Sequence, residues 1–273
     1  MILLIATIIL ASFSAAPAPN MFWEPEDLRG NVKYVLKSHY YTSNNYSTIE
    51  LGFQNEYEFN KDGTVSVHRQ YDNKEKLKNE TKLEYDRETG LRLKAVERNA
   101  VKEITRETLY KYNDVGQLSA KWEKFLNINN ESYLSLSLKY DEHGNKIEQN
   151  VYNREGELTS QTKFFFDDRN HLISYKRTSM HFGETSGDRT SNDKNLPTEV
   201  IRYGDDGEIS GHWKHRYDEY DNEVELKSYH PDGSLKLTEV NTYEYDDHGN
   251  WIKKTSMDNV DTTITERKIK YYK

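Results

Sequence analysis

A short recurring phrase limits what this chain can fold into more than any other feature. Its fullest form is Tyr-Glu-Tyr-Asp-Asp-His-Gly-Asn-Trp at residues 243–251, and related forms surround Tyr110, Tyr140, Phe164 and Tyr217. Two aromatic or apolar residues at i and i+2 are followed by Asp or Asn, usually with Gly three residues later. Alternating apolar residues predict a half-buried strand, and Asp or Asn followed by Gly predicts a tight turn. The phrase therefore predicts a strand end and its turn.

The spacing of the phrase predicts how many strands the chain contains. Gly63, Gly90, Gly116 and Gly144 lie 26 to 28 residues apart, which leaves room for two strands and a second turn in each interval. The fold class is therefore all-β: a long antiparallel meander of tandem hairpin repeats. Roughly seventeen such strands cannot stay flat, so we expect the sheet to curve or roll into a partial barrel or shell with the tyrosines inside.

Composition separates this chain from several classes of protein. Charged residues make up 31% and the formal net charge is −8, but the aromatic fraction of 12%, with 21 Tyr, argues against disorder. The acidic charge is spread along the chain, which argues against nucleic acid as a partner. The chain has no Cys, so it has no disulfide, thiolate metal site or Cys nucleophile.

The ends of the chain predict export and a single folded unit. Residues 1–16 are an apolar run followed by small residues, as in a signal peptide, although no Lys or Arg precedes the run. The run is shorter than the ~20 residues of a spanning helix, so no stable membrane span is expected after cleavage. Residues 17–27 are assigned as a linker and 28–273 as one β domain, with a polar loop insertion near 181–195. The location is then the periplasm, the cell surface or the exterior.

With its tandem Tyr-Xaa-Tyr-Asp-Xaa-Xaa-Gly-Asn phrases, the chain resembles YD-repeat (RHS-type) proteins over nearly all of residues 28–273. In particular it resembles small exported bacterial members that are encoded as stand-alone chains. Large members form hollow β-shells around an effector domain, and we expect no such domain in this shorter chain. Carbohydrate or cell-surface binding is what the resemblance implies here, and it carries over no catalytic residue.

Candidate catalytic and metal-binding groups each have a simpler explanation in the sequence. His212 and His215 lie three apart, so on a strand they face opposite sides of the sheet. Asp-rich turns do not match the spacing of a twelve-residue calcium loop. No nucleophile elbow, phosphate loop or zinc-protease helix is present. We therefore predict no catalytic, cofactor-binding or metal-binding residues, while a carboxylate pair on the concave face remains an open alternative.

The remaining candidates are aromatic residues that form a platform for a sugar or a peptide. The predicted platform residues are Trp122, Trp213, Trp251, Tyr243 and Tyr245. The alternative is that these rings pack the covered face of the sheet. The resulting functional prediction is an exported, non-enzymatic binding or scaffold protein that contacts a surface glycan or another envelope protein. A hydrolase and a purely structural envelope protein are the alternatives.

Overall fold

The computed structural model describes residues 28–42, 48–126, 128 and 130–273, so the predicted leader (1–16) and linker (17–27) lie outside the described residues. The strands are β1 (Val32–Thr42), β2 (Ile49–Phe59), β3 (Val65–Tyr71), β4 (Leu77–Tyr85), β5 (Arg92–Asn99), β6 (Ile104–Tyr112), β7 (Leu118–Phe125), β8 (Ser132–Tyr140), β9 (Lys146–Tyr152), β10 (Leu158–Phe166), β11 (Leu172–Ser179), β12 (Gly183–Ser191), β13 (Pro197–Tyr203), β14 (Ile209–Tyr217), β15 (Glu223–Tyr229), β16 (Leu235–Tyr245), β17 (Trp251–Met257) and β18 (Thr262–Tyr271).

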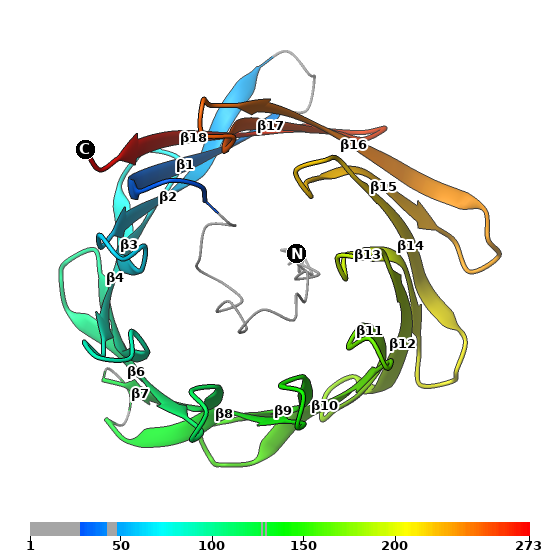
Figure 1. The fold of residues 1–273 in the computed structure, drawn as a ribbon, viewed down its shortest axis with the longest axis horizontal. Coiled ribbons are helices and arrows are strands. Elements are labelled where there is room, and N and C mark those ends of the chain that lie inside the picture. Colours follow the sequence, from blue (N-terminus) through cyan, green and yellow to red (C-terminus); the bar gives the residue numbers. More distant parts are fainter. Residues whose placement is uncertain (1–27, 43–47, 127, 129) are drawn as a thin grey trace.

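The strands form one closed barrel. Each strand pairs antiparallel with the next, and β1 also pairs with β18, so the 18-stranded sheet returns to its start. Figure 1 shows the strands as a ring seen along the barrel axis. The predicted all-β meander is confirmed, but the predicted partial barrel closes completely. Among the 18 described strands, closure leaves no unpaired edge, which removes the aggregation hazard that an open sheet carries.

The predicted loop near 181–195 is wrong, because most of this segment is strand β12. Its nine residues pair with β11 on one side and β13 on the other. The polar composition suggested a loop, but main-chain groups make the ladder bonds of a strand whatever its side chains are. Neighbours on both sides therefore hold this polar segment extended.

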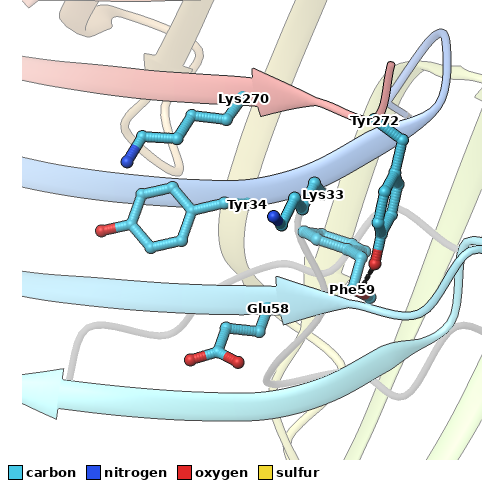
Figure 2. A pocket seen from close by; sticks show the side chains of 6 residues that line it. All are labelled: Lys33, Tyr34, Glu58, Phe59, Lys270 and Tyr272. Atoms are coloured by element: carbon cyan, nitrogen blue, oxygen red, sulfur yellow. Dashed lines mark hydrogen bonds between the residues drawn. The ribbon is translucent and has the colours of Figure 1, made fainter.

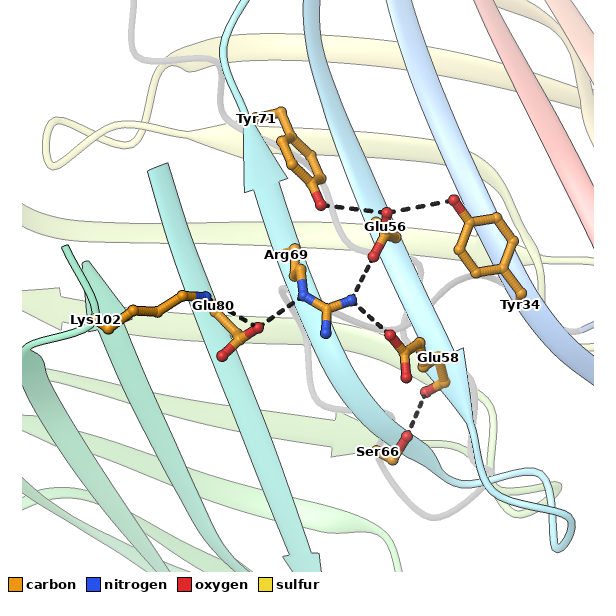
Figure 3. A network of polar contacts seen from close by, with 8 residues as sticks. All are labelled: Tyr34, Glu56, Glu58, Ser66, Arg69, Tyr71, Glu80 and Lys102. Carbon is orange, nitrogen blue, oxygen red and sulfur yellow. Dashed lines mark hydrogen bonds and ion pairs between the residues drawn. The ribbon is translucent and has the colours of Figure 1, made fainter. Parts of the chain in front are cut away.

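The register divides the strand residues into two faces. On one face lie Val35, Tyr57 and His68, which occupy one cross-strand row and are at most 6% exposed. On the other face lie charged residues such as Glu56 and Arg69. Side chains converge on the concave side of a barrel, so we assign the more buried face to the inner wall. Figure 3 agrees, since strands of the opposite wall lie behind the Glu56–Arg69 face.

Turns of one rim are joined laterally by tyrosine hydroxyls. This rim, the latch rim, consists of the turns 60–64, 86–91, 113–117, 141–145, 167–171, 192–196, 218–222 and 246–250. A tyrosine within two residues of the strand end donates to a backbone carbonyl 20 to 22 residues earlier, just after the preceding turn of this rim: Tyr85 to Val65, Tyr112 to Arg92, Tyr140 to Leu118, Tyr217 to Pro197 and Tyr243 to Glu223, at 2.8–2.9 Å. Tyr272 makes the corresponding bond across the closure, to the carbonyl of Phe59 at 2.6 Å. The repeated tyrosine is therefore a structural latch.

Asn250 connects the last turn of the latch rim to the first and last parts of the barrel's chain, at Arg29 and Tyr271. Its Nδ2 donates to the carbonyl of Arg29 and to the hydroxyl of Tyr271, both at 2.8 Å. Its Oδ1 accepts from the backbone N–H of Arg29 at 2.7 Å. The Tyr271 hydroxyl donates in turn to the carboxylate of Asp246. The side chain of Asn250 is only 3% exposed, so these bonds are shielded from water.

Replacing Asn250 with alanine should lower the free energy of unfolding by about 2 kcal/mol, because it removes three part-buried hydrogen bonds, two of them to the Arg29 backbone. Urea unfolding followed by far-UV circular dichroism measures the change. Glu208→Ala is the control, since Glu208 occupies the same turn position on the opposite rim and is exposed. Equal changes in the two variants would contradict the bridging role of Asn250.

Candidate functional site

The structure brings three of the five predicted platform residues together. Tyr243, Tyr245 and Trp251 lie on the inner wall at the end of β16 and the start of β17, with Tyr243 and Trp251 rings 6.1 Å apart edge to face. Trp213 is also on the inner wall but on β14, beside β13 and β15. Trp122 lies on the outer wall of β7 and is 39% exposed. The five residues therefore do not form one surface.

The three gathered residues are engaged in building the latch rim. The Tyr245 hydroxyl donates to Asp218 at 2.7 Å and accepts from Asn222 at 2.8 Å. Trp251 is 5% exposed, and the Arg267 guanidinium lies 3.3 Å from the centre of its ring. These contacts favour the packing interpretation for this group.

Trp213 belongs to a different arrangement on the inner wall. Gly211 lies in the same strand, and a Cβ atom at Gly211 would overlap the six-membered ring of Trp213. A Cβ at Gly187 would likewise overlap the ring of Tyr175. Both glycines therefore allow an aromatic ring to lie against the backbone, an arrangement that offsets the weakness of glycine in a strand.

Arg202 lies between these two rings. In the register it is opposite Gly187 on one side and Gly211 on the other, and Gly187 is itself opposite Tyr175. The Arg202 guanidinium is 5.4 Å from the centre of the Trp213 ring, and Nε donates to Ser210 at 3.1 Å. Burial raises the pKa of Tyr175, and the positive charges of Arg202 and Arg177 partly oppose that rise. We call Tyr175, Arg202 and Trp213 the wall cluster.

Sequence reasoning identified Trp213 but missed Tyr175 and Arg202. The available signal was the position of the glycines: Gly187 and Gly211 lie within strands, whereas Gly63, Gly116 and other repeat glycines occupy turns with positive φ. A glycine away from the turn positions marks a close approach of another group to the backbone.

A shallow pocket lies on the outer wall where β1, β2 and β18 meet. Figure 2 shows its lining residues, which are Lys33, Tyr34, Glu58, Phe59, Lys270 and Tyr272. Its volume is about 240 Å³, below the range of about 300–1,000 Å³ typical of ligand pockets. The Lys270 ammonium lies 4.8 Å from the centre of the Tyr34 ring. Cation–aromatic packing across the closure accounts for this arrangement.

Arg69 holds three carboxylates beside this pocket (Figure 3). Its guanidinium donates to Glu56, to Glu58 at 2.6 Å and to Glu80 at 2.7 Å. Glu80 is only 6% exposed and also pairs with Lys102 at 3.4 Å. Burial raises the pKa of Glu80, but the hydrogen bond and charge of Arg69, together with Lys102, bring it below its usual value.

Two tyrosines complete the arrangement around Glu56. Tyr34 on β1 and Tyr71 on β3 donate to Glu56 at 3.3 and 3.2 Å. Burial, reinforced by the negative charge of Glu56, raises the pKa of each tyrosine to about 12. The cluster therefore joins β1, β2, β3 and β4 on the outer wall, and its polar atoms bind one another.

His212 and His215 each pair with a different carboxylate. His212 contacts Glu199 at 2.7 Å on the outer wall, and His215 contacts Glu223 at 2.6 Å on the inner wall. The two rings therefore lie on opposite faces, as the strand spacing predicts. Among the residues that the structure describes, no group of three or more His, Asp or Glu side chains could hold a metal ion.

Acidification should destabilise the barrel through His68. This residue is 2% exposed, stacks on Tyr57 at 4.7 Å, and has its pKa lowered by burial from 6.5 to about 4. The unfolded chain takes up the proton first, so the stability contribution is complete above about pH 6.5 and is lost as the pH falls toward about 4. His68→Gln should flatten this part of the profile of melting temperature against pH, whereas His230→Gln, in an exposed turn, should not. Parallel profiles for both variants would contradict the assignment.

Comparison with known proteins finds likenesses only among solved structures. No protein-family model matches the chain, and no curated protein matches it. A porin-like protein from Bacteroides uniformis has 13% identity and a TM-score of 0.50, with 89% of this chain and 98% of that chain covered. A TcdB2-TccC3-TEV structure has 13% identity and a TM-score of 0.39, with 83% of this chain and 14% of that chain covered. A porin-like protein from Bacteroides vulgatus has 10% identity and a TM-score of 0.37, with 86% of this chain and 97% of that chain covered. The likeness to the first structure is one of fold.

Proposed function

We propose that this chain is an exported, non-enzymatic binding scaffold of the cell envelope, and that its inner wall binds a surface glycan. The observation that carries the proposal is the wall cluster, in which half-buried Tyr175 and Trp213 rings lie against an inner wall. Barrels of about 16–18 strands are too wide for their own side chains to fill. The aromatic rings therefore face space that a ligand can enter. The apolar leader and the porin-like fold support a location outside the cytoplasm.

The charged residues of the outer wall favour a barrel that is surrounded by water and not by lipid. Barrels embedded in a bilayer present an outward apolar band about 25 Å tall. Here the outer wall carries charged pairs along the strands, among them Lys139–Glu148 at 2.8 Å and Lys176–Glu184 at 3.0 Å. Such charges have a high free-energy cost in hydrocarbon.

The described part of the chain contains no helix with the length and hydrophobicity needed to span a bilayer.

Carboxyl groups of the barrel support binding over hydrolysis. A glycoside hydrolase needs a carboxylic acid whose pKa is raised, so that it can protonate the leaving group. In the described residues, hydrogen bonds or nearby cations lower each carboxyl pKa that departs clearly from its usual value, including those of Glu80, Glu148 and Glu199. Their cation partners keep these groups ionised, a poor state for a general acid.

Binding of the purified protein to an array of bacterial surface glycans, together with a pull-down from envelope extracts, tests the proposal. We expect glycan binding that Trp213→Ala weakens and Trp122→Ala, on the outer wall, leaves unchanged. An empty array and an empty pull-down would overturn the proposal. Release of reducing sugar from a bound glycan would establish the hydrolase instead, and flotation with phospholipid vesicles would contradict a barrel that works in water.

A further inference from the structure

We propose that the wall cluster is a subsite for an acidic sugar, with Arg202 binding its carboxylate and the rings of Tyr175 and Trp213 contacting its apolar face. This inference rests on the proposed function and specifies the charge of the ligand and its place on the inner wall. The argument uses the geometry of the rings, the charge of the surrounding wall and the geometry of a guanidinium group.

The rings form a surface whose shape is set by the backbone. Gly187 and Gly211 have no side chain to hold the rings away, so Tyr175 and Trp213 lie along the wall. The same packing occurs where Tyr41 covers Gly52, which shows that a ring over a strand glycine can be purely structural. The wall cluster differs because a cation lies between two such rings. A flat ligand can therefore contact aromatic faces and a charge together.

The inner wall formed by β10–β13, which holds Tyr175 and Arg202, is positively charged, although the whole chain has a net charge of −8. Inward-facing positions of β10–β13, all within the described residues, include Arg177, Arg189 and Arg202 and no Asp or Glu. Acidic residues of these strands, such as Glu184 and Asp188, lie on the outer wall. The three arginines therefore attract an anion to this part of the inner wall.

The arginines donate to neutral partners. Arg177 donates to Ser160 at 3.0 Å, Arg189 to Ser191 at 2.9 Å, and Arg202 to Ser210 at 3.1 Å. In the part of the chain that the structure describes, none of the three forms an ion pair with a carboxylate. Burial lowers the pKa of Arg189, which shows the cost of holding such a cation away from water. A carboxylate from a ligand would offset that cost.

Among anionic ligands, one that carries a carboxylate suits the wall cluster best. A guanidinium binds a carboxylate through two parallel N–H···O bonds and can stack on an aromatic ring at the same time. Arg202 already lies over Trp213 at 5.4 Å. A sugar that carries a carboxylate has the anion and an apolar C–H face in one ring, so it can occupy both parts of the cluster. We therefore assign the ligand class as a hexuronic acid within a polysaccharide.

Calorimetry with matched sugars tests this assignment on the full chain. The probes are hexuronic-acid oligosaccharides of several linkages, each beside its carboxyl-reduced neutral form. We expect the acidic form of at least one pair to bind about tenfold or more tightly than its neutral form. Arg202→Gln should remove that difference, and Trp213→Leu should weaken both forms. Arg216→Gln is the matched control, because Arg216 lies on the outer wall of β14. It should leave both affinities unchanged.

The outcomes separate this inference from the proposed function. Equal binding of acidic and neutral forms, or equal losses in Arg202→Gln and Arg216→Gln, would overturn the inference and leave glycan binding intact. An oligonucleotide that binds more tightly than every uronate would also overturn it. If no sugar binds, the inference fails, and an empty glycan array and envelope pull-down then remove the proposed function as well. If Arg202→Gln does not fold, the test uses the unaltered protein. Added NaCl should weaken its binding of the acidic sugar, because salt screens the charges. An affinity that NaCl leaves unchanged would overturn the inference.

Discussion

Trp251→Ala should lower the free energy of unfolding by about 3–5 kcal/mol, the range for removing a large buried aromatic side chain. Trp251 is 5% exposed at the start of β17. The substitution removes its contacts with Tyr243 and with the guanidinium of Arg267. Arg267 is itself only 4% exposed, so a buried cation loses an aromatic neighbour. Urea unfolding followed by far-UV circular dichroism measures the loss without relying on tryptophan fluorescence.

Trp122→Ala is the matched control for this prediction. Trp122 is 39% exposed on the outer wall, so its removal should cost less than about 1 kcal/mol. Both residues belong to the aromatic set identified from the sequence, and the two variants separate packing from display. Similar losses in the two variants would show that Trp251 does not have the structural role assigned here.

Arg69→Met should destabilise the barrel by about 3 kcal/mol at neutral pH, the lower end of the range for removing one partner of a buried ion pair. The side chain of Arg69 is 22% exposed, which reduces the effect relative to a fully buried pair. Its loss leaves Glu56, Glu58 and Glu80 close together, with Lys102 still paired to Glu80. Thermal unfolding at several pH values measures the effect.

The pH dependence of Arg69→Met should differ from that of the unaltered protein. In the unaltered protein the pKa of Glu80 is lowered, so its stabilising contribution is present above the unfolded pKa and is lost as the pH falls through the folded pKa. Without Arg69, burial and the neighbouring carboxylates raise that pKa, so protonation relieves the repulsion. The two stabilities should therefore converge as the pH falls from 7 toward about 4. A constant difference between them would contradict this account. Lys94→Met, which removes a single ion pair to Glu107, is the control.

The repeat phrase supplied most of the fold because turn chemistry is local. Asp246 accepts from the backbone of His248 and Asn250, and Gly249 has a φ of 76°, as expected for the predicted turn. Near 181–195 the polar composition predicted a loop, but the segment is mostly strand β12, because pairing to the neighbouring strands decided its conformation. His248, which local turn chemistry left unexplained, stacks on Tyr271 at 3.9 Å. That contact joins a turn residue to the last residue of β18 and has no signal in one repeat.

The candidate site was predicted less completely than the fold. Aromatic content identified Trp213 as a candidate, but the rings of Trp122 and Trp251 lie on opposite walls of the barrel. Which wall a side chain faces depends on the register and on the bulges that shift it, for example between Tyr245 and Glu244. A shift of one residue moves a side chain to the other face of a strand. Proximity of Tyr175, Arg202 and Trp213 therefore depended on the pairing of β11 to β14.

The sequence by itself determined the strands and the turns, because Asx-type turn bonds, glycine with positive φ and alternating apolar residues all act within about one hairpin of sequence. Tertiary structure decided that the meander closes, which residues face inward, and that the repeated tyrosine bonds to the preceding repeat. These features depend on accumulated twist and on cross-strand register, which act between residues far apart in the chain. The pairing of β1 with β18 joins Val35 to Ile269, and no local pattern specifies it.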